Sequence, residues 1–376
     1  MIELTDPTRR AAFYDKLDPL LKPLVKDPRD LPFVALTFSA LAVLVPFATF
    51  LFLSPEFSPW FSVAYLAILF LGFIDKFTLM LHCTSHRRLF ARHVDWMNHL
   101  IPGVLGPFMG QTPYTYFAHH IGMHHHENNL GEDLSSTLRF RRDSLRGFLR
   151  YFGRFFFFGI FELTRYHARR GRWKLFRMAL IGELGWVAAV ALLMWLNPRA
   201  TLTVFIIPFV MIRFLMMAGN WAQHAFVDAD APEDPYKNSL TCINTRYNRR
   251  SYNDGYHAGH HVKASRHWTE MPEDFLKNIA TYRDRDAIVF TGLDYFQIWA
   301  LLMTKQYGKL ARHFVDLRTE KRTEAQVVAL LRERTRKFTL GPRQGVESGV
   351  ASKGPGVQSE LREAPAIAAK PSPVGG

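Results

Sequence analysis

Four long apolar runs are separated by polar stretches along this chain. They extend over residues 33–53, 60–81, 178–196 and 202–221. A helix that crosses the hydrocarbon core of a bilayer needs about 20 apolar residues. Each run approaches or meets that length, whereas the apolar stretch at 101–110 is too short and too rich in Gly and Pro. The pattern predicts an all-α integral membrane protein with four transmembrane helices.

Few ionisable residues interrupt these runs. The third run carries Glu183 and the fourth carries Arg213. A charge inside a membrane span is costly and usually faces protein. The two side chains would pair if their helices are neighbours. Otherwise each would extend its stem toward a membrane surface, and the sequence leaves both interpretations open.

Composition divides the rest of the chain. Residues 1–30 are polar and form an N-terminal segment, and residues 31–290 form the membrane domain. Residues 291–340 are expected to be a helical C-terminal segment. From 341 to 376 the chain is mainly Gly, Pro, Ser and Ala with scattered charge, a composition that cannot bury a core and predicts disorder.

The charge distribution predicts the orientation in the membrane. The net charge is +14, from 47 Lys and Arg against 33 Asp and Glu. Residues 54–59 contain no Lys or Arg, whereas residues 82–175 contain 14 of them. Basic loops stay on the cytoplasmic side of a membrane. Both termini and the long middle loop are therefore expected in the cytoplasm.

Eleven of the 16 histidines lie in four groups beside the apolar runs. The groups are His82 and His86; His119, His120, His124, His125 and His126; His224; and His257, His260 and His261. Imidazole suits transition metals of intermediate softness. All four groups fall on the predicted cytoplasmic side. The sequence therefore predicts a cytoplasmic helical cap that holds a histidine-rich di-metal site.

The spacing within the groups supports this site. His82 and His86 are four residues apart, as are His120 and His124, and residues at that spacing share one face of a helix. Eight or nine imidazoles exceed the four ligands of one tetrahedral ion, so two metals are the simplest use of them. The two cysteines form no thiolate pattern, which disfavours a structural zinc site. Spacing alone does not separate zinc from iron.

The order His82-x3-His86, His120-x3-His124-His125 and His257-x2-His260-His261 resembles the three histidine boxes of the membrane fatty acid desaturase superfamily. Asn220-Trp221-Ala222-Gln223-His224 is similar to that superfamily's additional ligand segment. The stretch NDGYHAGHHVKASRHW, residues 253–268, resembles the third box of bacterial acyl-chain desaturases. The resemblance covers about residues 30–290.

This resemblance implies an O2-dependent di-iron enzyme that introduces a double bond into a fatty acyl chain. The implied metal ligands are His82, His86, His120, His124, His125, His224, His257, His260 and His261, with Asn220 reaching a metal through water. The fused haem domain of some relatives is absent, so electrons are expected from a separate protein, a ferredoxin or a small cytochrome. His119 and His126 are alternatives for the second box, and Asp75, Glu127, Asp133, Asp228 and Asp254 are candidates to orient ligands or line the tunnel.

Three other functions compete with the desaturase. A hydroxylase of the same superfamily, acting on a lipid or an alkane, would use the same ligands. A metal transporter would place ionisable residues along its spans rather than histidine groups at their ends. A nucleic-acid binder would explain the positive charge but not the four apolar runs, and no nucleic-acid partner is expected.

Overall fold

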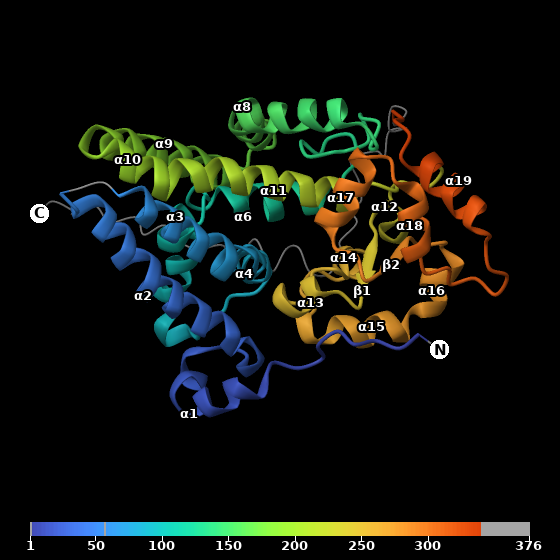
Figure 1. The fold of residues 1–376 in the computed structure, drawn as a ribbon, viewed down its shortest axis with the longest axis horizontal. Coiled ribbons are helices and arrows are strands. Elements are labelled where there is room, and N and C mark those ends of the chain that lie inside the picture. The colour runs from blue at the N-terminus through green and yellow to red at the C-terminus, as the bar shows by residue number, and fades with distance from the viewer. Residues whose placement is uncertain (1, 56–57, 340–376) are drawn as a thin grey trace, which may run out of the picture.

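The structure, a computed structural model, describes residues 2–55 and 58–339. The predicted disordered tail at 341–376 lies outside the described residues. The described chain is mostly helical, with long helices gathered in one half of the molecule and short helices with two small strands in the other (Figure 1). This division separates the apolar part of the chain from the polar part.

Four long helical segments account for the four predicted runs. They are α2 (Leu31–Leu53); α3 (Pro59–Ala67) continued through a π-helical turn (Ile68–Phe73) into α4 (Ile74–His86); α9 (Trp173–Leu196); and α10 (Pro198–Thr201) continued through a π-helical turn (Leu202–Ile206) into α11 (Ile207–Gln223). Each segment is long and apolar enough to cross a membrane. The second extends five residues beyond the predicted end at Leu81, so the same helix presents both His82 and His86.

The segment between the second and third long helices returns toward the histidines in short helical pieces. These are 3-10 helix Arg92–His99, π-helix Leu100–Leu105, α5 (Gly106–Phe108), α6 (Thr115–His119), π-helix His120–His124 and α7 (His125–Glu127). Gly182 of α9 allows a close approach here, because a Cβ atom at that position would lie 2.0 Å from the carbonyl oxygen of Pro113. The loop before α6 is therefore pressed directly against α9.

Helix α8 (Leu145–Arg169) lies beside α9 and α11 and contains four consecutive phenylalanines, Phe155–Phe158. The Ser144 side chain caps it by accepting a hydrogen bond from the Gly147 N–H at 3.1 Å. Phe148 is fully buried, whereas Phe157 and Phe161 are exposed. This one-sided exposure of aromatic side chains is typical of a helix at a membrane surface.

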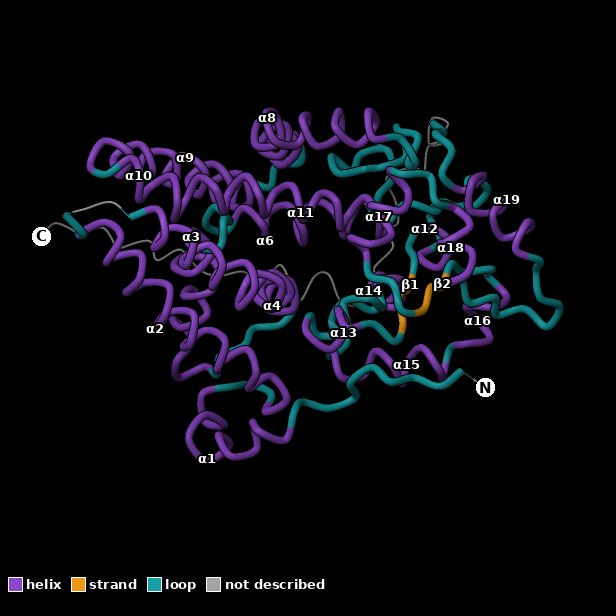
Figure 2. The backbone as a smooth tube through the Cα atoms, in the orientation of Figure 1, coloured by secondary structure: helices purple, strands orange, loops and turns teal. Residues whose placement is uncertain are grey.

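The other half contains short helices around a two-stranded parallel sheet (Figure 2). Strand β1 (Thr241–Ile243) pairs with β2 (Val289–Thr291), with Cys242 opposite Phe290. The helices are α12 (Pro235–Asn238), α13 (Arg246–Arg250), α14 (His257–Val262), α15 (Met271–Lys277), α16 (Ile279–Asp284), α17 (Tyr295–Met303), α18 (Tyr307–His313) and α19 (Glu324–Arg334). The all-α prediction missed this small sheet, whose strands have only three residues each.

The first residues of the N-terminal segment contact this half, whereas its helical part packs against α2. It contains α1 (Asp18–Leu21) and 3-10 helices at Ala12–Leu17, Lys22–Leu24 and Pro28–Asp30. Asp6 is buried and accepts a hydrogen bond from the Tyr256 hydroxyl at 2.7 Å. Tyr256 directly precedes α14, so the first residues of the chain support the helix that carries the third histidine box.

Candidate metal centre

Three helices and one π-helical turn bring the histidine boxes together. The end of α4 carries His82 and His86, and α14 carries His257, His260 and His261. His224 directly follows α11. The second box occupies the π-helix and the start of α7. Short π-helical turns are frequent at functional sites.

Five imidazoles form what we call the first histidine group. Its members are His82, His86, His120, His125 and His260. Their Nε2 atoms form a chain of close approaches: 2.9 Å from His82 to His260, and 3.1 Å from His260 to His125, from His125 to His120 and from His120 to His86. Four of the five side chains are buried and His125 is partly buried.

Four further imidazoles form the second histidine group. Its members are His124, His224, His257 and His261. The His257 Nε2 atom lies 3.3 Å from that of His224 and 3.0 Å from that of His261. The two groups are adjacent, since the rings of His124 and His125 are 5.9 Å apart.

The second and third boxes are each divided between the two groups. His120 and His125 enter the first group while His124 enters the second, and His260 enters the first group while His257 and His261 enter the second. His120 and His124 remain neighbours, with ring centres 5.7 Å apart, but they belong to different groups. The π-helical turn changes the angular spacing of the second box and turns His120 and His125, five residues apart, toward one centre.

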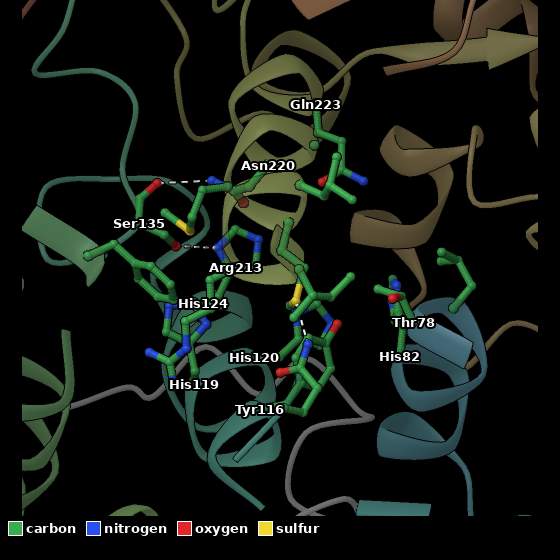
Figure 3. A pocket seen from close by; sticks show the side chains of 18 of the residues that line it. Thr78, His82, Tyr116, His119, His120, His124, Ser135, Arg213, Asn220 and Gln223 are labelled. Carbon is green, nitrogen blue, oxygen red and sulfur yellow. Dashed lines mark hydrogen bonds between the residues drawn. The ribbon is translucent and has the colours of Figure 1, made fainter. Parts of the chain in front are cut away.

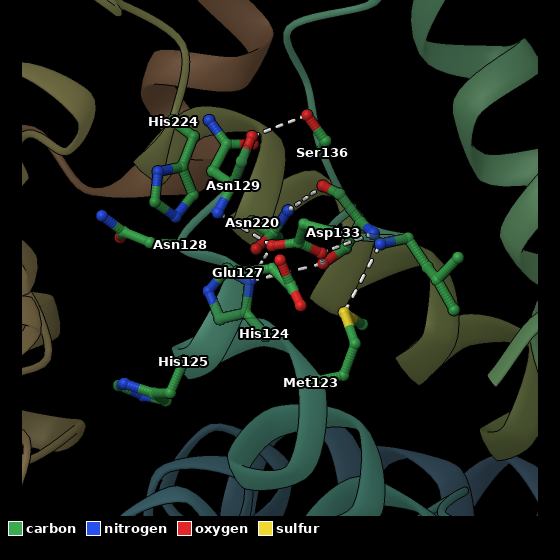
Figure 4. A network of polar contacts seen from close by, with 12 residues as sticks. Met123, His124, His125, Glu127, Asn128, Asn129, Asp133, Ser136, Asn220 and His224 are labelled. Carbon is green, nitrogen blue, oxygen red and sulfur yellow. Dashed lines mark hydrogen bonds and ion pairs between the residues drawn. The ribbon is translucent and has the colours of Figure 1, made fainter. Parts of the chain in front are cut away.

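The hydrogen bonds of the second group fix where its lone pairs point. His124 Nδ1 donates to the Asp133 carboxylate at 2.7 Å (Figure 4), and His224 Nδ1 donates to the Asn238 carbonyl oxygen at 3.0 Å. A neutral imidazole has one N–H, so the Nε2 atom of each ring presents a lone pair to the group. Ligand nitrogens about 2.1 Å from one metal lie about 3 Å apart. The donor set and its spacing therefore fit a cation in each group.

Several hydrogen bonds hold Asp133 in place. Its fully buried carboxylate also accepts hydrogen bonds from the Asn129 N–H at 2.9 Å, the Ser135 N–H at 2.8 Å and the Ser135 hydroxyl at 2.6 Å. Burial alone would raise the pKa of Asp133, but the electrostatic interaction with the His124 N–H and these hydrogen bonds outweigh it and lower the pKa. The carboxylate stays ionised and keeps a proton on His124 Nδ1.

Burial keeps the imidazoles in the form that binds metals. It lowers the pKa of His224 to about 4 and holds the pKa of His120, His257 and His260 well below the usual value, with neighbouring imidazoles adding to the effect. A metal ligand must be the neutral imidazole. These side chains are therefore neutral at physiological pH without needing a metal to deprotonate them.

The other candidate residues have varied positions. Asp254 lies 3.5 Å from His82 Nδ1 and accepts a hydrogen bond from the Tyr247 hydroxyl at 2.8 Å, so it contacts the first group. The prediction that Asp228 orients His224 is wrong: Asn238 occupies that place, and Asp228 pairs with Lys237 and Arg334, each at 3.2 Å.

The alternatives for the second box lie outside both groups. His119 faces a cavity instead, and His126 adjoins His125 without joining either group. Glu127 accepts hydrogen bonds from the Tyr166 hydroxyl at 2.7 Å and from Arg170 at 3.1 Å. The histidines of the second box that enter the two groups are therefore His120, His124 and His125, the three with the spacing of a histidine box.

A third cluster of possible ligands contains Asp27, Asp30 and His267. His267 Nε2 lies 2.9 Å from Asp30, and Arg87 forms an ion pair with the same carboxylate. Arg29 pairs with Asp27 at 2.7 Å. Cationic side chains already balance the charges of Asp27 and Asp30, so this cluster has little need of a metal ion. Its contacts link the N-terminal segment to Arg87, next to the first histidine box, and to His267, after the third.

A cavity of about 360 Å³ opens beside the histidines (Figure 3). His82, His120, His124 and His257 line one part of it, and apolar side chains of α4, α8 and α11 line much of the rest. Asn220 also lines it, and its Nδ2 atom donates to the Ser135 carbonyl oxygen at 3.1 Å and to the Tyr151 hydroxyl at 2.6 Å. An elongated apolar ligand in this cavity would lie against the imidazoles.

The ionisable residues of the long helices face the same cavity. Arg213 of α11 and Glu183 of α9 pair at 2.7 Å, which confirms the first of the two interpretations of these charges. Asp75 lines the cavity and pairs with Arg250 at 2.5 Å, rather than with its neighbour Lys76. Sequence reasoning did not find Gln111, Thr112 or Thr115 at this cavity, because the loop before α6 and the first residue of α6 carry no recognisable motif.

The fold and the two histidine groups define a helical membrane protein with the donor set of a di-metal centre. The family model described as fatty acid desaturase matches residues 58–292, which include every histidine of both groups. The chain belongs to the fatty acid desaturase family. The first long helix, α2, precedes the matched residues. No curated protein and no solved structure matches the chain.

Proposed function

We propose that this protein is an O2-dependent di-iron enzyme that introduces a double bond into a fatty acyl chain. The observation that carries the proposal is the convergence of nine imidazoles beside a largely apolar cavity. Family membership supports the same chemistry. An unactivated methylene has no acidic proton, so side-chain acid–base catalysis cannot remove its hydrogen, and a redox-active metal is required.

The proposed ligands follow the two groups. His82, His86, His120, His125 and His260 would hold one iron, and His124, His224, His257 and His261 would hold the other, with Asn220 in contact through water. Bound iron, O2 and electrons from an external protein would together supply the oxidant that removes hydrogen from the chain. Asp133 and Asn238 hold the rings of His124 and His224 in their orientation.

The remaining residues position the chain and exclude water. Ile160 and Leu163 of α8 and Met216 of α11 form part of the apolar wall of the cavity. Because the wall belongs to long helices, an acyl chain would bend along a fixed path, and that path selects which carbons meet the metals. The same ligands also support a lipid or alkane hydroxylase, in which oxygen is transferred to the carbon instead.

The proposed topology places the protein in the membrane with four spans. Both termini, the short helices α12–α19 and the histidine groups would lie on the cytoplasmic side, as the basic middle loop indicates. Residues 31–290 would form the catalytic membrane domain. A ferredoxin or a small cytochrome would deliver electrons at the basic cytoplasmic surface, where opposite charge accelerates association.

Product analysis tests the proposal directly. Cells that express the chain are compared with cells that express the His260→Ala variant, and their lipids are profiled by mass spectrometry. A desaturase product has lost two hydrogens, whereas a hydroxylase product has gained one oxygen. Absence of any desaturated or hydroxylated product in the cells that express the native chain, with the protein present in the membrane, would contradict both activities.

A further inference from the structure

The cavity has a polar end around Arg213 of α11, apart from the two histidine groups. Helix α11 lines it from Ile212 to Gln223, a length of about 16 Å at 1.5 Å per residue. Gln223 directly precedes His224 of the second histidine group, whereas Arg213 lies 11 residues before His224, on the same helix as Asn220 and Gln223 (Figure 3). Arg213 belongs to a candidate membrane span, so this end of the cavity is inside the apolar part of the protein.

Three side chains from three different segments meet there. Arg213 Nη2 and the Thr112 hydroxyl both donate to one carboxylate oxygen of Glu183, at 2.7 and 2.6 Å. The Arg213 and Glu183 side chains are only 12% and 10% exposed. The Arg213 guanidinium also lies over the Phe209 ring, 4.1 Å from its centre. Well-packed apolar residues of similar volume are often as stabilising as a buried ion pair, so stability alone does not explain these charges.

Several hydrogen-bonding groups at this end have capacity to spare. Arg213 has five N–H donors, and its contacts with Glu183 and Thr112 involve Nη2 alone. Thr115 Oγ1 and His119 Nε2 line the same cavity and are buried without a hydrogen-bond partner in the described part of the chain. Unsatisfied buried polar atoms are costly unless a ligand or water completes them. The end of the cavity is therefore equipped to hold an oxygen atom.

Charge balance restricts the nature of that oxygen. Arg213 is neutralised by Glu183, so the pair carries no net charge. A carboxylate placed beside Glu183 would add an uncompensated negative charge in an apolar environment, which is strongly unfavourable. A hydroxyl or carbonyl oxygen would accept from Arg213 without that penalty.

We propose that the substrate lipid carries a neutral oxygen group, a hydroxyl or a carbonyl, at the end of its apolar chain that enters the membrane part of the cavity. This inference rests on the proposed function and narrows its substrate class. The reacting carbons lie against the histidines while the oxygen group binds Arg213, Thr115 and His119. A plain hydrocarbon end would leave these groups unsatisfied and would bind less tightly.

Binding measurements on iron-loaded protein in detergent test this inference without requiring turnover. The probes are dodecane, hexadecane and octadecane and the corresponding primary alcohols, with affinities measured by native mass spectrometry. We expect the hydroxylated member of at least one pair to bind about tenfold more tightly, as one hydrogen bond allows. Equal affinities within all three pairs would overturn the inference.

Two double variants separate recognition from stability. Glu183→Leu with Arg213→Met removes the ion pair and keeps its volume, and it should abolish the preference while the melting temperature and iron content stay near those of the native protein. The matched control, Arg154→Met with Glu162→Leu, removes the 2.8 Å ion pair of α8, whose residues do not line the cavity, and should keep the preference.

A preference that survives in the Glu183→Leu, Arg213→Met variant would show that the pair is structural and would refute the inference. Loss of desaturation or hydroxylation products in cells refutes the proposed function separately, because the binding assay depends on the lipid end and not on the reaction.

Discussion

At the scale of single residues, the division of the boxes makes the two metal positions separately testable. His260 approaches His82 and His125 in the first group, whereas His261 approaches His257 in the second. Replacing His260 with alanine should abolish product formation and lower the iron content from about two per chain toward one, because one ligand set is broken. Membrane insertion should be unchanged.

Elemental analysis and lipid profiling of the purified His260→Ala protein check this expectation. His93→Ala is the matched control, since His93 is exposed and outside both groups. Full activity with native iron content in His260→Ala would exclude this side chain as a ligand. The same pair of measurements on His261→Ala reports on the second group.

Asp133 gives a second prediction at this scale. Asp133→Asn removes the charge that holds the proton on His124 Nδ1, and the loss of such an orienting carboxylate typically weakens metal binding about 10- to 100-fold. We expect faster loss of iron to a chelator, followed by absorbance. Glu132→Gln, a change to the exposed neighbouring carboxylate, should match the native rate. Indistinguishable rates for the two variants would remove Asp133 from the site.

At the scale of secondary structure, hydropathy was sufficient to predict the four long helices and the ends that carry His82 and His224. It did not predict the π-helical turn at His120–His124. The histidine spacing was interpreted with the period of an α-helix, whereas a π-helix has more residues in each turn. The small sheet and the contact of Asn238 with His224 were also missed, since both depend on residues brought together only by folding. The sequence indicated which histidines converge, but not how they divide between the two groups.

The contact between α9 and the loop before α6 gives a prediction for an element. Gly182→Ala would place a Cβ 2.0 Å from the Pro113 carbonyl oxygen, so α9 must move away from the segment that leads to the second box. We expect a destabilisation of about 1–3 kcal/mol and a lower melting temperature in detergent. Activity should fall as well, because Glu183 and the cavity wall move with the helix.

Gly185→Ala is the control for this change. It lies on the same helix, and a Cβ there would meet no atom within 4 Å. Its melting temperature should equal or slightly exceed that of the native protein, because alanine favours helices more than glycine does. If both variants melted like the native protein, the close approach of α9 would not occur in the membrane.

At the scale of the whole molecule, the proposed topology places all histidines on one side of the bilayer. Cysteines introduced at Pro55 and Lys277, both exposed, should therefore react from opposite sides with a membrane-impermeant maleimide. In inside-out vesicles Lys277→Cys should be labelled and Pro55→Cys protected, with the reverse result in intact cells. Labelling of both positions from one side would refute the four-span arrangement.

Each histidine group combines residues from several boxes, and this limits when a complete set of donors can form during synthesis. Both groups contain residues of α14, which follows all four long apolar helices along the chain. During synthesis neither set of donors is complete until that late helix has left the ribosome. A complete donor set for either group can therefore form only after translation of the last long apolar helix.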